Sequence, residues 1–233
     1  LASLSSGNSI KITESKMTRD HTERMISYLD GSIEISESSQ GKTIFLKNSK
    51  LSEISTYEVV GDFSSAAFII VAALISKNSE VLIKNVGLNN TRSGLLEVLL
   101  KMNASIEIVN KRKTCNEDCG DILVKSSKLE GINVPNSIIP NIIDEIPILS
   151  IAASFAEGQT TIKNVSELKV KESDRLHATS TGLKAMNIEH DLLDDGLIIN
   201  GSLDDIEINE EIESFGDHRI AMSFLIAGLR SKN

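Results

Sequence analysis

The densest group of charged residues in the sequence spans 169–175 and reads Lys-Val-Lys-Glu-Ser-Asp-Arg. If a helix begins near Glu172, then Lys171 and Arg175 lie four residues apart on one side of it, and Glu172 precedes Arg175 by three. A solvated helix end with an ion pair between Glu172 and Arg175 is one interpretation of this pattern. The other is a helix start that binds an anion.

A second group, Asp217-His218-Arg219, opens a run of apolar residues that continues to Leu229. Helix capping accounts for Asp217, but it does not account for Arg219, because a positive charge is unfavourable at the positive end of a helix dipole. Arg19 and Arg92 are expected to have the same unfavourable placement. Arginines at helix N-termini are favourable when an anion is bound there, because the backbone N–H groups, the dipole and the guanidinium then act together. The pattern therefore predicts an anion-binding active site.

Other chemistries find little support in the sequence. Neither Gly-x-x-x-x-Gly-Lys-Ser/Thr nor Gly-x-Gly-x-x-Gly is present. The histidines near these groups, His21 and His218, have no nucleophile placed beside them, which argues against a hydrolase triad. Cys115 and Cys119 form an isolated Cys-x-x-x-Cys pair, which is weak support for a zinc site.

The elements that must position these residues follow a repeat. Three apolar runs are each long enough for a buried helix, and they begin at Asp62, Asp144 and Asp217, which are 82 and 73 residues apart. Asp62 and Asp217 are expected to cap their helices, and Asp144, followed by Glu145 and then by Pro147 in the first turn, opens its helix in the same way.

Each buried helix is followed by the same predicted order of a strand, an amphipathic helix and two more strands. The first unit has its strand at 80–84, its helix around 95–102 and its further strands at 105–109 and 121–125; the second has 160–163, 176–186, 188–192 and 196–200. Residues 1–47 fit an incomplete unit, with a helix tail at 1–4, strands at 9–13, 32–35 and 42–47, and a helix at 18–29 capped by Thr18. A fixed internal period of this kind predicts an α/β fold made of repeated units.

Composition restricts the partners. The 233 residues carry a formal net charge of −9 and are 40% hydrophobic. A field of that sign disfavours nucleic acid and anionic lipid as partners. The longest apolar run, 66–75, is too short to span a membrane, and no secretory signal is visible, so we expect a cytoplasmic protein with neither nucleic-acid nor membrane partners.

Five motifs, in the same order along the chain, together resemble 5-enolpyruvylshikimate-3-phosphate (EPSP) synthases. They are Arg-Asp-His-Thr-Glu-Arg-Met at 19–25, Gly-Asp-Phe-Ser-Ser-Ala-Ala at 61–67, Ile-Pro at 139–140 followed by Asp-Glu-Ile-Pro at 144–147, Val-Lys-Glu-Ser-Asp-Arg at 170–175 and Asp-His-Arg-Ile-Ala-Met at 217–222. The resemblance covers the whole chain.

The resemblance implies two domains of βαβαββ units, each an inside-out α/β barrel with helices inside and sheets outside. Residues 1–57 would be the C-terminal part of the first domain, and residues 58–233 would be two full units and the start of a third in the second domain. The family transfers the enolpyruvyl group of phosphoenolpyruvate to the 5-hydroxyl of shikimate 3-phosphate and releases phosphate. It needs no metal or organic cofactor, and we expect the complete enzyme to be a monomer.

The resemblance also implies roles for individual residues. Asp144 would contact the shikimate hydroxyls and act as the base toward the attacking one, and Glu172 would take part in proton transfer at the phosphoenolpyruvate methylene. The four substrate-binding cations would be Lys171, which meets substrate anions, Arg175 and Arg219, which clamp phosphoenolpyruvate, and Arg19, which lies on the shikimate-phosphate side.

The sequence departs from the family at both ends. The family's N-terminal Lys-Ser and Arg elements, its phosphate-binding Ser-rich stretch and a C-terminal lysine are missing, so we expect a chain truncated at both ends and inactive by itself. Two alternatives are open. One is the related transferase that acts on UDP-N-acetylglucosamine, and the other is a non-catalytic repeat module that binds a partner through its helix ends.

Overall fold

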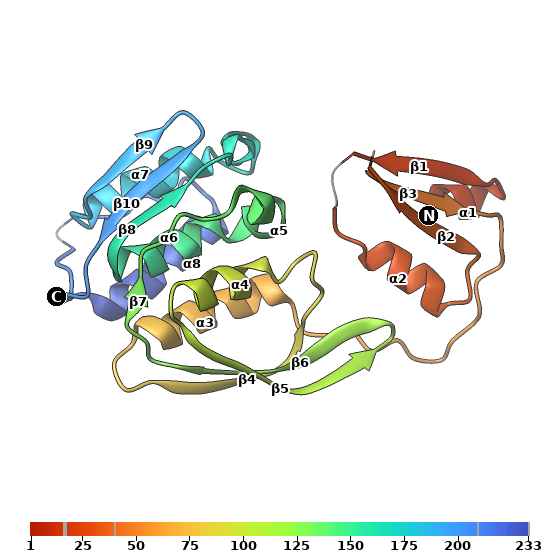
Figure 1. The fold of residues 1–233 in the computed structure, drawn as a ribbon, viewed down its shortest axis with the longest axis horizontal. Helices are drawn as coiled ribbons and strands as arrows, with labels where there is room; N and C mark the ends of the chain where they lie inside the picture. The colour runs from red at the N-terminus through yellow and green to blue at the C-terminus, as the bar shows by residue number, and fades with distance from the viewer. Residues whose placement is uncertain (16–17, 40, 209, 233) are drawn as a thin grey trace.

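The computed structural model describes residues 1–15, 18–39, 41–208 and 210–232. Figure 1 shows a small N-terminal part and a larger body joined by a linker over residues 47–60, which contain no helix or strand. The small part consists of α1 (Ala2–Ser6), β1 (Ile10–Glu14), α2 (His21–Tyr28), β2 (Ile33–Ser38) and β3 (Gly41–Leu46). Its strands form an antiparallel sheet in the order β1-β3-β2.

The larger body begins with a unit of two helices and a three-stranded antiparallel sheet in the order β4-β6-β5. Its elements are α3 (Phe63–Ile75), β4 (Glu80–Gly87), α4 (Gly94–Lys101), β5 (Ser105–Thr114) and β6 (Glu117–Lys125).

The next unit has a four-stranded sheet in the order β7-β8-β10-β9, in which β7 and β8 are parallel. Its strands are β7 (Leu129–Glu130), β8 (Ala156–Ile162), β9 (His190–Leu193) and β10 (Gly196–Gly201). Its helical segments are η1 (Asn136–Ile138), α5 (Ile139–Ile142), η2 (Ile143–Glu145), α6 (Ile146–Ser154), η3 (Ser166–Val170) and α7 (Arg175–Ala185), and α8 (His218–Ala227) and η4 (Gly228–Arg230) follow.

The apolar helices α3, α6 and α8 pack against one another inside the larger body, and the two sheets lie outside them (Figure 1). All nine residues of α6 are buried, and so are ten of the thirteen residues of α3. A helix without a polar face must be enclosed by other elements, which explains why these helices are central and the sheets peripheral. This is the predicted arrangement of helices inside and sheets outside.

The segment before each central helix pairs in parallel with the segment after it. Gly61 pairs with Val86 around α3, and β7 pairs with β8 around α6. Ile206 pairs with Ser231 around α8. The extended segment before each helix is thus the first strand of a βαβ crossover, which gives the predicted βαβαββ order.

The repeated Ile-Lys-Asn-Val sequence marks equivalent positions in the two units. Asn85 and Asn164 both have left-handed backbones, with φ of 56° and 62°. The backbone N–H of Asn85 donates to Asp121 at 2.9 Å, and that of Asn164 donates to Asp195 at 3.2 Å. Asparagine tolerates this conformation better than most residues with side chains, so the repeat in sequence reflects a repeated left-handed backbone position, at a bulge within β4 in one unit and just after β8 in the other.

Several predicted boundaries were wrong. The helix predicted from Asp144 starts in the 3-10 turn η2 and continues as α6 only from Ile146, because Pro147 lacks the N–H of a continuous helical ladder and suits the first turn of a new helix. Asp20, not Thr18, is the N-cap residue of α2, and β8 begins four residues before the predicted strand at 160–163. Strands β5 and β6 extend into a hairpin that reaches from Ser105 to Lys125, beyond the predicted 105–109 and 121–125.

The third apolar helix is less enclosed than predicted. In α8, Ile220 and Phe224 are buried, but Leu225 is 73% exposed. Within the described residues, the helices that α8 contacts are α3, α6 and α7, with η4 following it. The stretch Asn136–Ser154 is long and apolar enough to cross a membrane, yet 78% of its most apolar window is buried inside the fold, so core packing accounts for its composition.

Candidate active site

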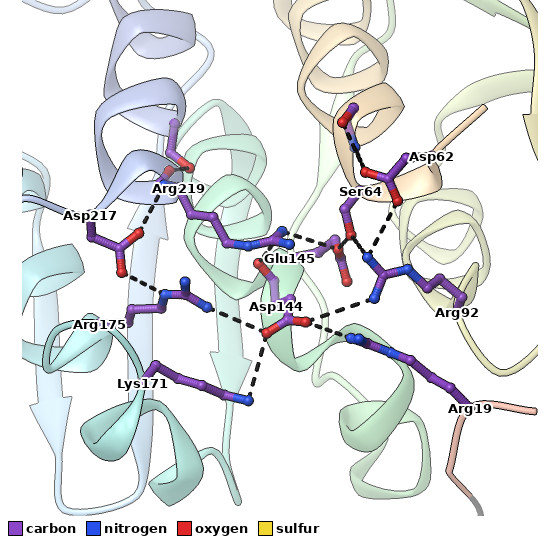
Figure 2. A network of polar contacts seen from close by, with 12 residues as sticks. Arg19, Asp62, Ser64, Arg92, Asp144, Glu145, Lys171, Arg175, Asp217 and Arg219 are labelled. Atoms are coloured by element: carbon purple, nitrogen blue, oxygen red, sulfur yellow. Dashed lines mark hydrogen bonds and ion pairs between the residues drawn. The ribbon is translucent and has the colours of Figure 1, made fainter. Parts of the chain in front are cut away.

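The predicted site residues meet where the N-terminal ends of α3, α6 and α8 converge (Figure 2). At the centre lies Asp144, whose side chain is 14% exposed. One carboxylate oxygen, Oδ2, accepts a hydrogen bond from Arg19 Nη2 at 2.5 Å, and the other, Oδ1, accepts one from Arg175 Nη1 at 3.3 Å. Lys171 Nζ is 3.7 Å from Oδ1, and Arg92 Nη1 is 3.8 Å from Oδ2. Four cations from three separate parts of the chain thus surround one carboxylate.

This environment keeps the Asp144 carboxyl ionised. Burial opposes ionisation, but the hydrogen bond from Arg19 and the charges of Arg219, Arg19 and Lys171 outweigh it, so the pKa of Asp144 lies below its ordinary value. Asp144 is located in the 3-10 turn η2, and the N-cap position of α6 is occupied by Glu145. The turn points the carboxylate out of the helix axis toward the surrounding cations (Figure 2).

Arg175 is the most enclosed of these cations, with a side chain that is 1% exposed. Its Nε donates to Asp217 at 2.7 Å and its Nη2 to Glu172 at 2.5 Å, in addition to the contact with Asp144. Asp217 also caps α8 by accepting from the backbone N–H of Arg219 at 2.8 Å. The predicted cap at Asp217 is therefore confirmed, and the same carboxylate also orients Arg175, which the sequence did not indicate. Burial opposes the ionisation of Asp217, but its bonds from Arg175 and Arg219 lower its pKa.

The Lys-Glu-Ser-Asp-Arg segment forms the approach to α7. The helix α7 begins at Arg175, one residue before the predicted range 176–186 and three residues after Glu172, and it is capped by Asp174, which accepts from the N–H of His177 at 2.9 Å. Lys171 and Glu172 precede the helix in extended and irregular backbone. The Glu172 side chain is 58% exposed although it pairs with Arg175, so its carboxyl reaches the open side of the site.

Arg219 is held by two consecutive residues. Its Nη1 donates to the backbone oxygen of Asp144 at 3.2 Å and lies 3.4 Å from Oε1 of Glu145. Glu145 is almost fully buried. Burial raises its pKa, and although a hydrogen bond from Ser64 and the charges of Arg219 and Arg92 oppose that rise, they do not cancel it. Two adjacent carboxyls, Asp144 and Glu145, therefore have pKa values shifted in opposite directions.

Ser64 and Glu145 were not predicted as site residues, and Arg92 was noted only for its placement. Arg92 Nη2 donates to Ser64 Oγ at 2.7 Å and lies 3.4 Å from Asp62. Ser64 in turn donates to Glu145. Asp62 caps α3 as predicted, accepting from the N–H of Ser65 at 2.9 Å. The sequence signal for Arg92 was its position just before α4, but nothing in the sequence connects it to Glu145.

A surface cavity of about 350 Å³ opens beside Asp144. It is lined by Thr18, Arg19, Thr91, Pro140, Asn141, Ile143, Asp144, Glu167 and Lys171. A cavity with cations on its wall and an ionised carboxylate at its edge suits a small anionic ligand that also carries a hydroxyl group. No group of three or more His, Cys, Asp or Glu side chains within the described ranges is placed to hold a metal ion, and Cys115 and Cys119 are free thiols.

Comparison with known proteins shows the family of this chain. The sequence pattern that defines EPSP synthase (3-phosphoshikimate 1-carboxyvinyltransferase) matches residues 1–233. The chain belongs to the EPSP synthase family. A relative from Petrotoga mobilis, named 3-phosphoshikimate 1-carboxyvinyltransferase, is 47% identical over all of this chain and 53% of its own length. One of the same name from Clostridium tetani is 44% identical over 99% of this chain and 52% of its own length.

The solved structures agree with this family. An EPSP synthase structure from Acinetobacter baumannii has a TM-score of 0.89 and 41% identity, covering 97% of this chain and 51% of that one. The predicted two-domain enolpyruvyl transferase fold is thereby confirmed as the fold to which this chain corresponds. The chain spans about half the length of the EPSP synthases that it matches.

Proposed function

We propose that the complete polypeptide is an EPSP synthase that transfers the enolpyruvyl group of phosphoenolpyruvate to the 5-hydroxyl of shikimate 3-phosphate. The observation that carries the proposal is the convergence on Asp144 of Arg19, Arg92, Lys171 and Arg175. The two substrates bring two phosphates and two carboxylates into one site, and such a site needs several fixed cations to offset their mutual repulsion.

In this proposal Asp144 is the base. The 5-hydroxyl oxygen forms a bond to C2 of phosphoenolpyruvate as its proton passes to the carboxylate, and C3 gains a proton. Cations weaken the basicity of Asp144 in the free protein, as its lowered pKa indicates. When substrate anions bind, they neutralise those cations and raise the pKa of the carboxyl, so the base becomes stronger once both substrates are present.

Glu172 is proposed to exchange the proton at C3. It delivers that proton during addition and removes one in the second step, when the bond from C2 to the phosphate oxygen breaks and the double bond forms again. The leaving phosphate takes the proton that Asp144 had accepted. Its exposed carboxyl, bonded to Arg175, is suited to this role because it can turn toward a ligand while Asp217 retains the guanidinium. Arg175 and Arg219 would bind phosphoenolpyruvate, and Lys171 would meet substrate anions.

Arg19 is proposed to bind shikimate 3-phosphate. It lies between β1 and α2 in the small part, yet it reaches Asp144 in the larger body. We further propose that residues 1–57 belong to the first domain and residues 58–233 to the second, so that the substrates bind between two domains. We expect the enzyme to be a cytoplasmic monomer without a metal or organic cofactor.

Phosphate release by the complete polypeptide, measured with phosphoenolpyruvate and either shikimate 3-phosphate or UDP-N-acetylglucosamine, tests the function. We expect phosphate release when the acceptor is shikimate 3-phosphate and not when it is UDP-N-acetylglucosamine. Mass spectrometry should then identify the enolpyruvyl product. Phosphate release only with UDP-N-acetylglucosamine as the acceptor would establish the related transferase instead. The absence of phosphate release with either acceptor would favour a non-catalytic module.

A further inference from the structure

Glu145 lies behind the candidate active site, not on its surface. Its side chain is 2% exposed, compared with 14% for Asp144 and 58% for Glu172. The carboxylate oxygen Oε1 accepts a hydrogen bond from the Ser64 hydroxyl and lies 3.4 Å from Arg219 Nη1. A buried carboxylate is costly without such partners, and this one is out of reach of a substrate in the cavity. Its contacts with protein groups therefore define what it does.

Helix capping does not account for Glu145. The residue occupies the N-cap position of α6, but its side chain makes no capping hydrogen bond to that helix. In contrast, Asp62, Asp174 and Asp217 each accept a backbone N–H at the start of their helices. The Glu145 carboxylate is directed instead toward Arg219 and Ser64, which belong to α8 and α3 (Figure 2).

The first consequence concerns Arg219. Its Nη1 is held at 3.2 Å from the backbone oxygen of Asp144 and at 3.4 Å from Glu145. Two acceptors on one nitrogen restrict the plane of the guanidinium. An arginine grips an anion with two parallel hydrogen bonds only when that plane is correctly oriented.

The second consequence concerns Asp144. Ser64 donates to Glu145 and accepts from Arg92 Nη2 at 2.7 Å, and Arg92 Nη1 lies 3.8 Å from Asp144 Oδ2. That Nη1 is buried and has no hydrogen-bond partner among the described residues, so Asp144 is its near counter-charge. The contacts thus form a closed ring from Glu145 through Ser64 and Arg92 to Asp144, whose backbone leads back to Glu145. Connected polar networks of this kind hold their members rigidly.

We propose that Glu145 is a positioning residue for phosphoenolpyruvate binding, which fixes the Arg219 guanidinium directly and links it to Asp144 through Ser64 and Arg92. The inference rests on the proposed function, because it takes Arg219 as a ligand of phosphoenolpyruvate. Glu145 itself does not touch the substrate and is not a catalytic residue.

Steady-state kinetics of the complete polypeptide carrying Glu145→Ala or Glu145→Gln test this role. We expect Glu145→Ala to raise the KM for phosphoenolpyruvate about tenfold, the effect of losing one charge-assisted hydrogen bond. Glu145→Gln retains an acceptor oxygen and is expected to raise it less. The KM for shikimate 3-phosphate should stay within about twofold, because a lost positioning contact to Arg219 affects one substrate.

Glu23→Gln is the matched control. Glu23 is also a buried carboxylate with a cationic partner, Lys42 at 2.8 Å, but it lies on α2 away from Arg219. The Glu23→Gln substitution is expected to lower the Tm and to leave the KM values for both substrates unchanged. Should Glu145→Ala fail to fold, Glu145→Gln decides, because it has nearly the same volume.

Three results would overturn the proposal. If the wild type is active and the folded Glu145 variants have the same KM for phosphoenolpyruvate as the wild type, the positioning role alone is overturned. A lower Tm and kcat with both KM values unchanged shows a purely structural role and also overturns it. An inactive wild type overturns the proposed function, and the positioning role with it.

Discussion

Asp144 gathers more positive charge than a single carboxylate needs. Removing Asp144 would leave Arg19 and Lys171 without this counter-charge and Arg175 with only Glu172 and Asp217. The surplus of cations is explained if substrate anions complete the balance of charge. The residue is thus expected to matter more for turnover than for stability, because Arg19, the partner in its shortest contact, is 45% exposed and such ion pairs contribute little to folding.

Asp144→Asn tests this expectation in the complete polypeptide. The amide keeps the shape but cannot accept the hydroxyl proton, so we expect kcat to fall by about 10²- to 10⁴-fold, the usual contribution of a general base. Phosphate release measures the effect. Asp191→Asn, at an exposed position on β9, is the control and should keep normal turnover. Comparable turnover in both variants would contradict the role of Asp144 as base.

At the scale of elements, the site depends on how closely α3, α6 and α8 pack at their N-terminal ends. The helix α8 is also packed closely against α7, and a Cβ added at Gly182 of α7 would come within 2.1 Å of the Phe224 ring of α8. The glycine permits α7 to approach α8 closely, and this approach brings Arg175 near Asp217.

Gly182→Ala is expected to destabilise the fold by about 1–3 kcal/mol, because the methyl group forces the Phe224 ring out of its place. Thermal denaturation followed by circular dichroism measures the loss. Combining it with Phe224→Leu should recover part of the stability, because the smaller side chain removes the clash. A double variant less stable than the sum of the two single changes would contradict this explanation.

A second element-scale contact joins the end of α8 to the C-terminal end of α3. Asp205 binds Lys77 at 2.7 Å and Arg230 at 2.5 Å, and Arg230 also donates to the carbonyl oxygen of Ile75 at 2.9 Å. The hydrogen bonds from Lys77 and Arg230 lower the pKa of Asp205 to about 2, from 3.8 for the unperturbed group. A cation beside the last carbonyls of α3 is also favourable for the helix dipole.

The Asp205 carboxylate should therefore stabilise the protein most at neutral pH. Because its pKa is lower in the folded state, its contribution is complete above pH 3.8 and is lost as the pH falls toward 2. Urea unfolding of wild type and Asp205→Asn should show a difference at pH 6 that disappears near pH 2. A difference that persists unchanged at pH 2 would contradict this linkage.

At the scale of the whole molecule, the small part meets the larger body through polar contacts. Asp20 accepts from Asn89 at 2.6 Å, His21 lies 2.7 Å from Glu117, and Arg24 donates to Asp118 at 3.0 Å. These contacts place α2 against the β5–β6 hairpin and keep Arg19 close to Asp144. Polar interfaces between parts of one chain are compatible with relative motion, which suits a site formed by two domains.

Arg24→Ala should loosen this interface and expose the linker over residues 47–60. We expect faster cleavage by a lysine-specific protease at Lys47 and Lys50, leaving the larger body resistant, as the proposed boundary at 57/58 requires. Mass spectrometry of the time course identifies the fragments. Arg112→Ala, an ion-pairing residue within the β4-β6-β5 sheet, is the control and should leave the linker rate unchanged. Cleavage spread through residues 58–233 would contradict the boundary.

The sequence by itself determined the repeat, because a helix that is apolar on every face can be stable only inside other elements. It also determined which residues begin those helices, so the caps at Asp62 and Asp217 were predictable from side chains that accept backbone N–H groups over two or three residues. The unfavourable charge of Arg219 at a helix start was visible in the same local way. Local rules sufficed because each of these interactions joins near neighbours in the chain.

Only the tertiary structure decided which charges meet. The contact of Arg19 with Asp144 spans 125 residues and that of Ser64 with Glu145 spans 81, and no periodicity connects such positions. Asp144 and Glu145 are adjacent in sequence, yet one has a lowered pKa and the other a raised one. Their difference comes from burial and from partners brought together by the packing of α3, α6 and α8, so the electrostatic environment of these side chains depends on that packing more than on their neighbours in the chain.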